Sequence, residues 1–284
     1  MSTTIRELEP KEVWNRFADI NAVPRPSKKE QKITAFMIDF GKKLGLETTS
    51  DAYGNVIIRK PATAGLEHKK PIILQSHLDM VCQKNNDTVF DFDNQGIETY
   101  IDGDWVRAKG TTLGADNGMG VAAIMAILES KTIAHPTLEA LFTTDEETGM
   151  TGAQKLSNDA LKGEILLNLD TELDTEIEIG CAGGIDVSAY ADYKEEATPS
   201  DVVAYHIVVN GLLGGHSGME IHLGRGNANK LMNRVLFHQY EKHGLRLAQL
   251  HGGGLRNAIP RESEAIVVVP KKNQVAFEKD FKEN

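Results

Sequence analysis

An apolar segment at residues 71–74 runs almost directly into His77 and Asp79, and this feature constrains the fold more than any other part of the chain. A short apolar run bounded by polar residues predicts a buried strand. In α/β proteins such a strand is covered on both faces, and residues just past its carboxyl end carry the chemistry. There, His77 offers a ring nitrogen to a metal ion, and Asp79 can accept the other ring N–H. The alternative for this motif alone is a hydrated loop.

Three further segments place acidic residues beside an apolar element. A glycine-rich turn at residues 110–120 precedes a predicted apolar helix over 121–128, and apolar strands begin at Leu138 and Ile165. The acids at these places are Asp116, Glu146, Glu147 and Asp170. Taken singly, each has an ordinary explanation as a helix N-cap, a solvated loop or a strand-ending turn.

Taken together, these acids and His77 predict one metal site. Imidazole with carboxylates suits zinc, and manganese or cobalt can substitute for it. A metal hydrolase also needs one carboxylate outside the ligand set, which acts as general base towards an attacking water. Because the pattern repeats after separate elements, we interpret these residues as a hydrolytic centre.

Six motifs in combination resemble the aminoacyl-histidine dipeptidases (also called Xaa-His or β-alanyl-histidine dipeptidases), co-catalytic di-zinc exopeptidases related to aminoacylase. The resemblance runs from near Leu8 to the end of the chain. The motifs lie at residues 76–80 (SHLDM), 112–118 (TLGADNG), 146–149 (EETG), 180–184 (GCAGG), 214–218 (GGHSG) and 256–260 (RNAIP).

The resemblance implies two zinc ions per complete subunit, with Co²⁺ or Mn²⁺ as possible substitutes. Asp116 would bridge the two ions, and the peptide bond that follows Asp116 would be cis. His77 and Asp170 would complete one site, and Glu147 would contribute to the other.

The resemblance also implies the roles of residues that do not bind metal. Glu146 would take a proton from the attacking water and pass it to the leaving amine, while Asp79 would orient His77. His216, flanked by glycines in a separate domain, would face the tetrahedral oxyanion, often across a dimer interface. Asn229 and Asn257 are weaker candidates for gripping a substrate carboxylate, and a structural role explains each equally well.

Composition narrows the classes of partner and compartment. The 284 residues include 31 Lys and Arg against 41 Asp and Glu, and the net charge of −10 argues against nucleic acid or an anionic membrane as partner. Cys82 and Cys181 form no CxxC motif, which favours a reducing compartment. The first ten residues lack the apolar core of a signal peptide, and no segment reaches transmembrane length. We therefore expect a cytoplasmic protein.

The predicted fold class is α/β, with a zinc-exopeptidase-like mixed sheet, flanking helices and an inserted, ferredoxin-like α+β lid domain. Residues 1–184 would form the first part of the metal-binding domain and residues 185–284 the first part of a lid and dimerisation domain. Gly180, Gly183 and Gly184 mark the expected hinge. Around and beyond the hinge we predict strands over 176–179, 185–191, 202–209, 245–250 and 265–269, and a helix over 228–240.

The first domain should open with two helices. Pro10 would begin one helix, and a capping box from Ser27 to Glu30 would begin the second, which should extend to Leu44. Hairpins are predicted at residues 46–60, around Gly54, and at residues 97–108.

The chain departs from the family pattern in one respect. The family completes its catalytic domain with a segment after the lid, and that segment supplies a last histidine ligand to the second metal; no matching histidine motif occurs here. We therefore expect an amino-terminal portion of a longer enzyme that hydrolyses dipeptides of the Xaa-His type, including β-Ala-His, with these residues alone inactive. The alternatives are an inactive assembly or binding module, and a related di-zinc tripeptidase or aminoacylase.

Overall fold

The computed structural model describes residues 4–171, 173, 175–180 and 187–283. The chain divides into two compact units, Met1–Cys181 and Ala182–Asn284. Within the described residues, none of the helices has both the length and the apolar character that a membrane span requires.

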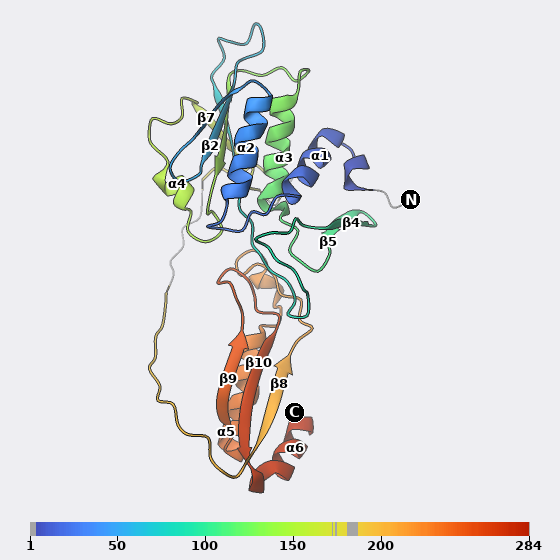
Figure 1. The fold of residues 1–284 in the computed structure, drawn as a ribbon, viewed down its shortest axis with the longest axis vertical. Coiled ribbons are helices and arrows are strands. Elements are labelled where there is room, and N and C mark those ends of the chain that lie inside the picture. The colour runs from blue at the N-terminus through green and yellow to red at the C-terminus, as the bar shows by residue number, and fades with distance from the viewer. Residues whose placement is uncertain (1–3, 172, 174, 181–186, 284) are drawn as a thin grey trace. The chain divides into compact units, whose positions relative to one another are not determined.

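The first unit is built on a mixed five-stranded sheet with strand order β1-β2-β6-β3-β7 (Figure 1). Its strands are β1 (Glu47–Ser50), β2 (Val56–Lys60), β3 (Ile72–His77), β6 (Leu138–Thr143) and β7 (Ile165–Asn168). β3 pairs in parallel with β6 and β7, while β2 is antiparallel to both β1 and β6. The predicted mixed sheet and flanking helices, and with them the α/β class, are confirmed.

Both faces of this sheet are covered because its strands carry apolar side chains on both sides. The helices are η1 (Ile5–Glu7), α1 (Lys11–Asn21), α2 (Gln31–Lys43), α3 (Ala115–Glu129) and α4 (Thr151–Lys155). α1, α2 and α3 pack on the face that carries Ile58 and Phe142. The opposite face carries Ile57, Ile73 and Leu141, which pack against the segment following α4.

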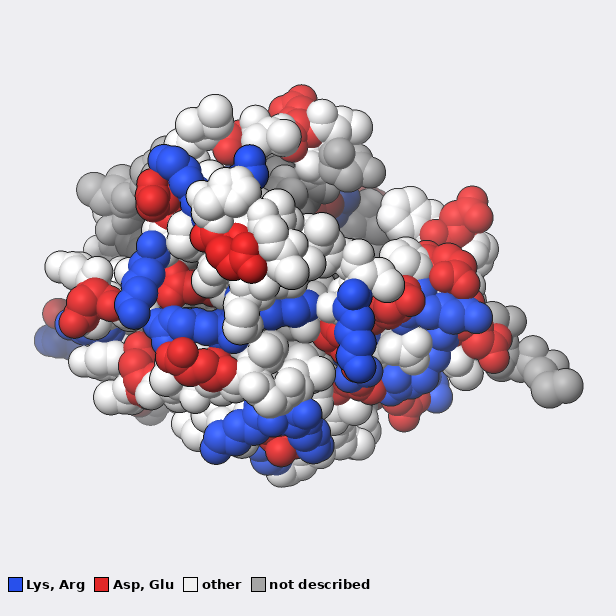
Figure 2. Space-filling model, turned by 90° about the horizontal axis from the view of Figure 1, so that it is seen from above, with Lys and Arg blue, Asp and Glu red and all other residues white. Residues whose placement is uncertain are grey.

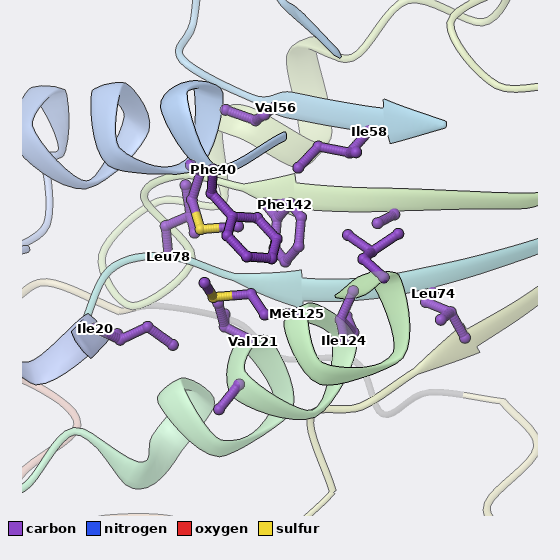
Figure 3. Packing of buried hydrophobic residues seen from close by; sticks show 14 of the residues in the cluster. Ile20, Phe40, Val56, Ile58, Leu74, Leu78, Val121, Ile124, Met125 and Phe142 are labelled. Atoms are coloured by element: carbon purple, nitrogen blue, oxygen red, sulfur yellow. The ribbon is translucent and has the colours of Figure 1, made fainter. Parts of the chain in front are cut away.

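The central helix α3 is apolar on nearly all sides, and this explains its position. Ile124 and Met125 are fully buried, in the cluster that also contains Phe40 of α2 and Phe142 of β6 (Figure 3). A helix without a polar face is stable in water only when other elements surround it. Because α3 is buried along its length, packing holds its amino terminus in a fixed position relative to the sheet.

A separate hairpin, β4 (Thr99–Asp102) and β5 (Trp105–Ala108), is antiparallel and turns at Gly103, whose φ of 60° suits glycine. The sequence predicted this turn and the hairpin of β1 and β2.

On the face shown in Figure 2, basic and acidic side chains are interspersed, so the described residues gather no large patch of one sign there.

The predicted capping box is wrong. The hydroxyl of Ser27 donates instead to Oδ2 of Asp79, at 2.7 Å. The Oε1 atom of Glu30 accepts the N–H groups of Lys28 and Asp145, at 2.8 and 3.0 Å. α2 consequently begins at Gln31 without a side-chain cap, because both capping residues bind other parts of the chain.

The second unit contains a three-stranded antiparallel sheet, order β8-β10-β9, with helices α5 and α6 packed against it. Its elements are β8 (Val202–Val209), η2 (Ile221–Leu223), α5 (Ala228–His243), β9 (Arg246–Gly252), β10 (Ser263–Pro270), η3 (Lys271–Asn273) and α6 (Gln274–Glu283). Ala265, Val267 and Val269 alternate along β10 towards a core shared with Met232 and Phe277. The side chain of Asn227 caps α5 by accepting the N–H of Lys230.

Two predicted strands near the hinge are wrong over their described residues. Residues 176–179 and 187–191 carry no strand, and their side chains are exposed. A lone extended segment leaves its backbone N–H and C=O groups to water, and an apolar residue such as Tyr190 has no neighbouring strand to pack on. Residues 181–186, including Gly183 and Gly184 of the expected hinge, lie outside the described residues.

Candidate metal centre

His77, the last residue of β3, lies at the centre of a cluster of carboxylates. Its side chain is 1% exposed, and its Nε2 atom lies 3.0 Å from Oδ1 of Asp116. Oε2 of Glu146 lies 3.9 Å from the same nitrogen, and Oδ1 of Asp170 lies 3.7 Å from it. The acids that the sequence placed after separate elements therefore meet around one imidazole.

Two groups of potential ligands share this histidine. One contains His77, Glu146 and Asp170, and the other contains His77, Asp116 and Glu147. Within each group one ligand atom per residue lies within 4.8 Å of the others, a spacing that a single cation can bridge. In the part of the chain that the structure describes, His77 is the one imidazole in these groups.

The parallel pairing of the strands explains this convergence. Because β3 is parallel to both β6 and β7, the carboxyl ends of all three reach the same edge of the sheet. His77 closes β3, Glu146 and Glu147 follow β6, and Asp170 follows β7.

Asp116 reaches this edge from the start of α3. The left-handed φ of 71° at Gly114 turns the chain into the helix, and Asp116 itself departs from helical geometry, with φ −80° and ψ 117°. The Asp116–Asn117 peptide bond is cis, as the family resemblance implied.

Asp79 holds the turn that carries the two glutamates. Its Oδ1 accepts the backbone N–H of Glu146 at 3.0 Å, and its Oδ2 accepts that of Glu147 at 3.2 Å. The Nδ1 atom of His77 lies 3.4 Å from Oδ1 of Asp79 and 3.1 Å from the carbonyl oxygen of the same residue. If the ring donates to that carbonyl through Nδ1, Nε2 faces the cluster as a ligand atom.

The turn between β6 and α4 is further held from within. Asp145 adopts a positive φ of 56°, and its carboxylate accepts the hydroxyls of Thr148 and Thr151. These contacts hold Asp145, the first of three successive acids, within the turn. The other two, Glu146 and Glu147, are directed towards His77.

Asn117 is a site residue that sequence reasoning missed. Its Nδ2 atom donates to Oδ1 of Asp170 and to the carbonyl oxygen of Leu169, the latter at 3.1 Å. Asn117 thereby fixes the orientation of one candidate ligand. Its position directly after Asp116, in the same glycine-rich motif, was the available signal.

The electrostatics of the cluster favour an added positive charge. Burial alone would lower the pKa of His77, but hydrogen bonds to Asp116 and Asp79 and the charge of Asp170 outweigh it and raise this pKa to about 10. Burial, followed by the charge of Asp116, raises the pKa of Glu147 to about 7. The cluster thus retains protons that free side chains would release.

Glu146 and Asp170 show the same tendency. Burial is the main cause that raises the pKa of each, and the imidazolium of His77 opposes it. Carboxylates brought this close together repel one another, and a divalent cation relieves that repulsion more effectively than a shared proton. The donor set of one imidazole and several carboxylates therefore fits a divalent metal ion.

His216 lies in the second unit, on a loop whose neighbours are held to the segment 257–259. The N–H of Ser217 donates to the carbonyl oxygen of Asn257 at 2.9 Å, and that of Ile259 to Gly215 at 2.8 Å. Nδ1 of His216 accepts two backbone N–H groups, from Gly218 and Met219, each at 3.1 Å. These bonds place the proton of the neutral ring on Nε2, so the exposed ring presents an N–H donor to its surroundings.

The two asparagines differ in their environment. The side-chain Nδ2 of Asn229, on α5, donates to the carbonyl oxygen of Gly252 at 3.1 Å, which ties the helix to the end of β9. Asn257 belongs to the segment that supports the His216 loop.

Comparison with known proteins agrees with these features. Residues 73–274 match the model of peptidase family M20/M25/M40. The cytosol non-specific dipeptidase of Escherichia coli is 48% identical over 265 residues, which cover 93% of this chain and 55% of the relative. The crystal structure of aminoacylhistidine dipeptidase from Vibrio alginolyticus superposes with a TM-score of 0.63 at 46% identity, over 99% of this chain and 57% of that one. The chain thus spans little more than half the length of these relatives, and it belongs to peptidase family M20/M25/M40.

Proposed function

We propose that this chain supplies the metal-binding and proton-transfer residues of a dipeptidase that prefers Xaa-His substrates, including β-Ala-His. The observation that carries the proposal is the convergence of His77, Asp116, Glu146, Glu147 and Asp170 at one sheet edge. The names of the two relatives add support, since one is a non-specific dipeptidase and the other an aminoacylhistidine dipeptidase.

His77, Asp116, Glu147 and Asp170 are the residues that would hold two zinc ions, and Asp116 would contribute to both sites. Zinc suits imidazole and carboxylate donors, and Co²⁺ or Mn²⁺ would replace it. When bound, the metal supplies a Lewis acid that polarises the scissile carbonyl and lowers the pKa of water towards about 7.

Glu146 is the proposed general base. The side chain of Glu146 is one-third exposed. The pKa of Glu146 is raised, which brings it closer to the pKa values of the water and the amine with which it would exchange protons. It would take a proton from the attacking water and deliver it to the leaving amine. Asp79 would act indirectly, by fixing both the Glu146 backbone and the ring of His77.

We further propose that residues 1–184 act as the catalytic domain and residues 185–284 as a lid through which two subunits associate. The Nε2–H group of His216 would donate a hydrogen bond to the oxyanion, and Asn229 or Asn257 would contact the substrate carboxylate. The cytosolic relative supports a cytoplasmic location.

The experiment is a hydrolysis assay on the purified native gene product that contains these residues. After treatment with EDTA and addition of Zn²⁺ or Co²⁺, the enzyme should release histidine from β-Ala-His and Ala-His. Ala-Leu is the matched dipeptide without imidazole, and it should give kcat/KM lower by about tenfold or more. Faster cleavage of Ala-Ala-His would indicate a tripeptidase, and faster cleavage of N-acetyl-histidine an aminoacylase. Equal rates on Ala-His and Ala-Leu would contradict the histidine preference alone.

A further inference from the structure

Arg25 is a buried charged residue for which the proposed reaction has no direct use. It lies between α1 and α2, and only 2% of its surface is exposed. A buried guanidinium is costly unless its donors are paired, so its partners indicate why it is there.

Its Nη2 atom donates to Oδ1 of Asn21 at 3.4 Å, and its other partners are the backbone carbonyls of two segments that carry the metal centre. Nη1 donates to the carbonyl oxygens of Leu78 at 3.3 Å and Asp79 at 3.2 Å, directly after His77. Nη2 donates to the carbonyl oxygen of Gly114 at 2.5 Å, two residues before Asp116. One planar group therefore bridges the loop after β3 and the turn before α3.

The backbone of Arg25 strengthens the first of these links. Its carbonyl oxygen accepts the N–H of Met80 at 3.2 Å, and the adjacent Pro26 forms a β-bridge with the same residue. The loop after β3 is thus attached to Arg25 through both side chain and main chain.

The glycines of the α3 turn make room for the guanidinium. A Cβ atom at Gly114 would lie 2.4 Å from Nη2 of Arg25, and one at Gly118 would lie 2.8 Å from it. Both contacts are shorter than van der Waals packing permits, so the glycine-rich motif and the arginine fit one another.

The charge of Arg25 also suits this place. Burial lowers its pKa to about 10, while the charges of Asp79 and Asp116 act in the opposite direction. The guanidinium therefore remains protonated at neutral pH. It places a positive charge close to carboxylates that repel one another in the metal-free protein.

We propose that Arg25 is a positioning residue that ties the loop after β3 to the turn before α3 and so fixes His77 relative to Asp116. The inference rests on the proposed metal centre. Partners that orient ligands in this indirect way change metal affinity by about 10–100-fold. A lysine at this position would keep the charge but lose the fork that reaches three carbonyls at once.

The test compares Arg25→Lys and Arg25→Met with matched changes at Arg59. Arg59 is also largely buried, with a side chain 21% exposed, and it bonds Glu47, Glu139 and the carbonyl oxygen of Ala160, all outside the metal centre. Two measurements are made on the native gene product. Calorimetric titration with Co²⁺ gives the metal affinity, and hydrogen exchange of the metal-free protein reports on peptides covering residues 78–81 and 112–118.

Arg25→Lys should weaken Co²⁺ binding by about 10–100-fold and speed exchange in both peptides. Arg59→Lys should lower the melting temperature while leaving Co²⁺ affinity within about threefold of wild type, the scatter expected of distant sites. If Arg25→Met fails to fold, Arg25→Lys carries the test. Unchanged Co²⁺ affinity or unchanged exchange in folded Arg25→Lys would overturn the proposal. Failure of the wild-type protein to bind Co²⁺ would refute the metal centre itself, and the inference with it.

Discussion

The Oδ1 atom of Asp79 lies 3.0 Å from the backbone nitrogen of Glu146 and accepts its N–H. Because Oδ2 accepts the next N–H along the chain, that of Glu147, one buried carboxylate sets the direction of two side chains with different proposed roles. The candidate base and a candidate ligand therefore depend on the same support.

Asp79→Asn should disturb both glutamates. An amide has only one acceptor oxygen. Its NH₂ group would therefore face one of the two backbone N–H groups that Oδ1 and Oδ2 accept in the wild-type protein. We expect Co²⁺ affinity to fall by about 10–100-fold in calorimetric titration. Ser27→Ala is the matched control, since it removes only one neutral donor to Asp79, and it should cost about 1 kcal/mol of stability. An Asp79→Asn protein that binds Co²⁺ as tightly as wild type would show that the support is dispensable.

The two glutamates should separate in their effects. Glu146→Gln should retain metal while kcat in the native gene product falls by about 10²–10⁴, the usual contribution of a general base. Glu147→Gln should instead lower metal occupancy, measured by atomic absorption after gel filtration. Loss of metal from Glu146→Gln with retention by Glu147→Gln would reverse the two assignments.

Most of the fold could be predicted because hydrophobic periodicity marks buried elements. The strands that end at His77 and Thr143 and the helix α3 are strongly apolar, and tertiary packing keeps them as the pattern suggested. The capping box failed for the opposite reason. Ser27 and Glu30 satisfy a local rule, but Asp79 and the Asp145 N–H compete for the same atoms across the fold.

The site could be predicted only in part. Ligand types beside predicted strands and a glycine-rich helix start are visible in the sequence, so the candidate residues could be found: His77, Asp116, Glu146, Glu147 and Asp170. Arg25 and Asn117 act through contacts to residues 89 and 53 positions away, respectively. The motif that holds Asp116 marks Asn117 as a neighbour of the site, but nothing in the sequence identifies the partner of either residue. Only the fold brings them together.

The metal-free protein should lose stability as pH rises. Glu147 has a folded pKa of about 7, above its ordinary 4.5, so the unfolded chain releases this proton first and stability falls between those values. His77 has a folded pKa of about 10, above 6.5, so its stabilising contribution is complete below 6.5 and is lost as pH rises through 10. Asp79, whose pKa is lowered, acts oppositely and only at the acidic end.

Thermal melts in EDTA at several pH values provide the check. The melting temperature should be lower at pH 8 than at pH 5.5, and Glu147→Gln should flatten the part of the decline below pH 7. Excess Zn²⁺ should raise stability more strongly as pH increases, because metal ligands bind in their deprotonated forms. A melting temperature that rises from pH 5.5 to 8 in EDTA would contradict the proposed proton sharing.

The number of zinc ions held by the polypeptide of residues 1–284 follows from its ligands. In the proposed assignment His77, Asp116 and Asp170 would provide three donors for one ion. Because the Nε2 atom of His77 can bind only one ion, Asp116 and Glu147 would be left as two donors for the other. Zinc sites in proteins normally have three or four protein ligands. We expect about one tightly bound zinc per chain after dialysis, measured by mass spectrometry of metals, and two retained ions would show a ligand arrangement other than the one proposed.

His216→Ala should lower kcat of the native gene product by about 10²–10³, the range for loss of one oxyanion donor, with metal content unchanged. The reason is the ring geometry: Nδ1 is occupied by the N–H groups of Gly218 and Met219, so Nε2 presents a proton that alanine cannot replace. Ser217→Ala is the matched control on the same loop and should leave kcat near wild type.

If the histidine of one subunit serves the metal centre of another, mixing His216→Ala with Glu146→Gln should restore part of the activity, because some mixed dimers then contain one intact pair. A kcat unchanged by His216→Ala would remove this residue from the mechanism, and a drop in kcat without recovery on mixing would place it in its own subunit's site.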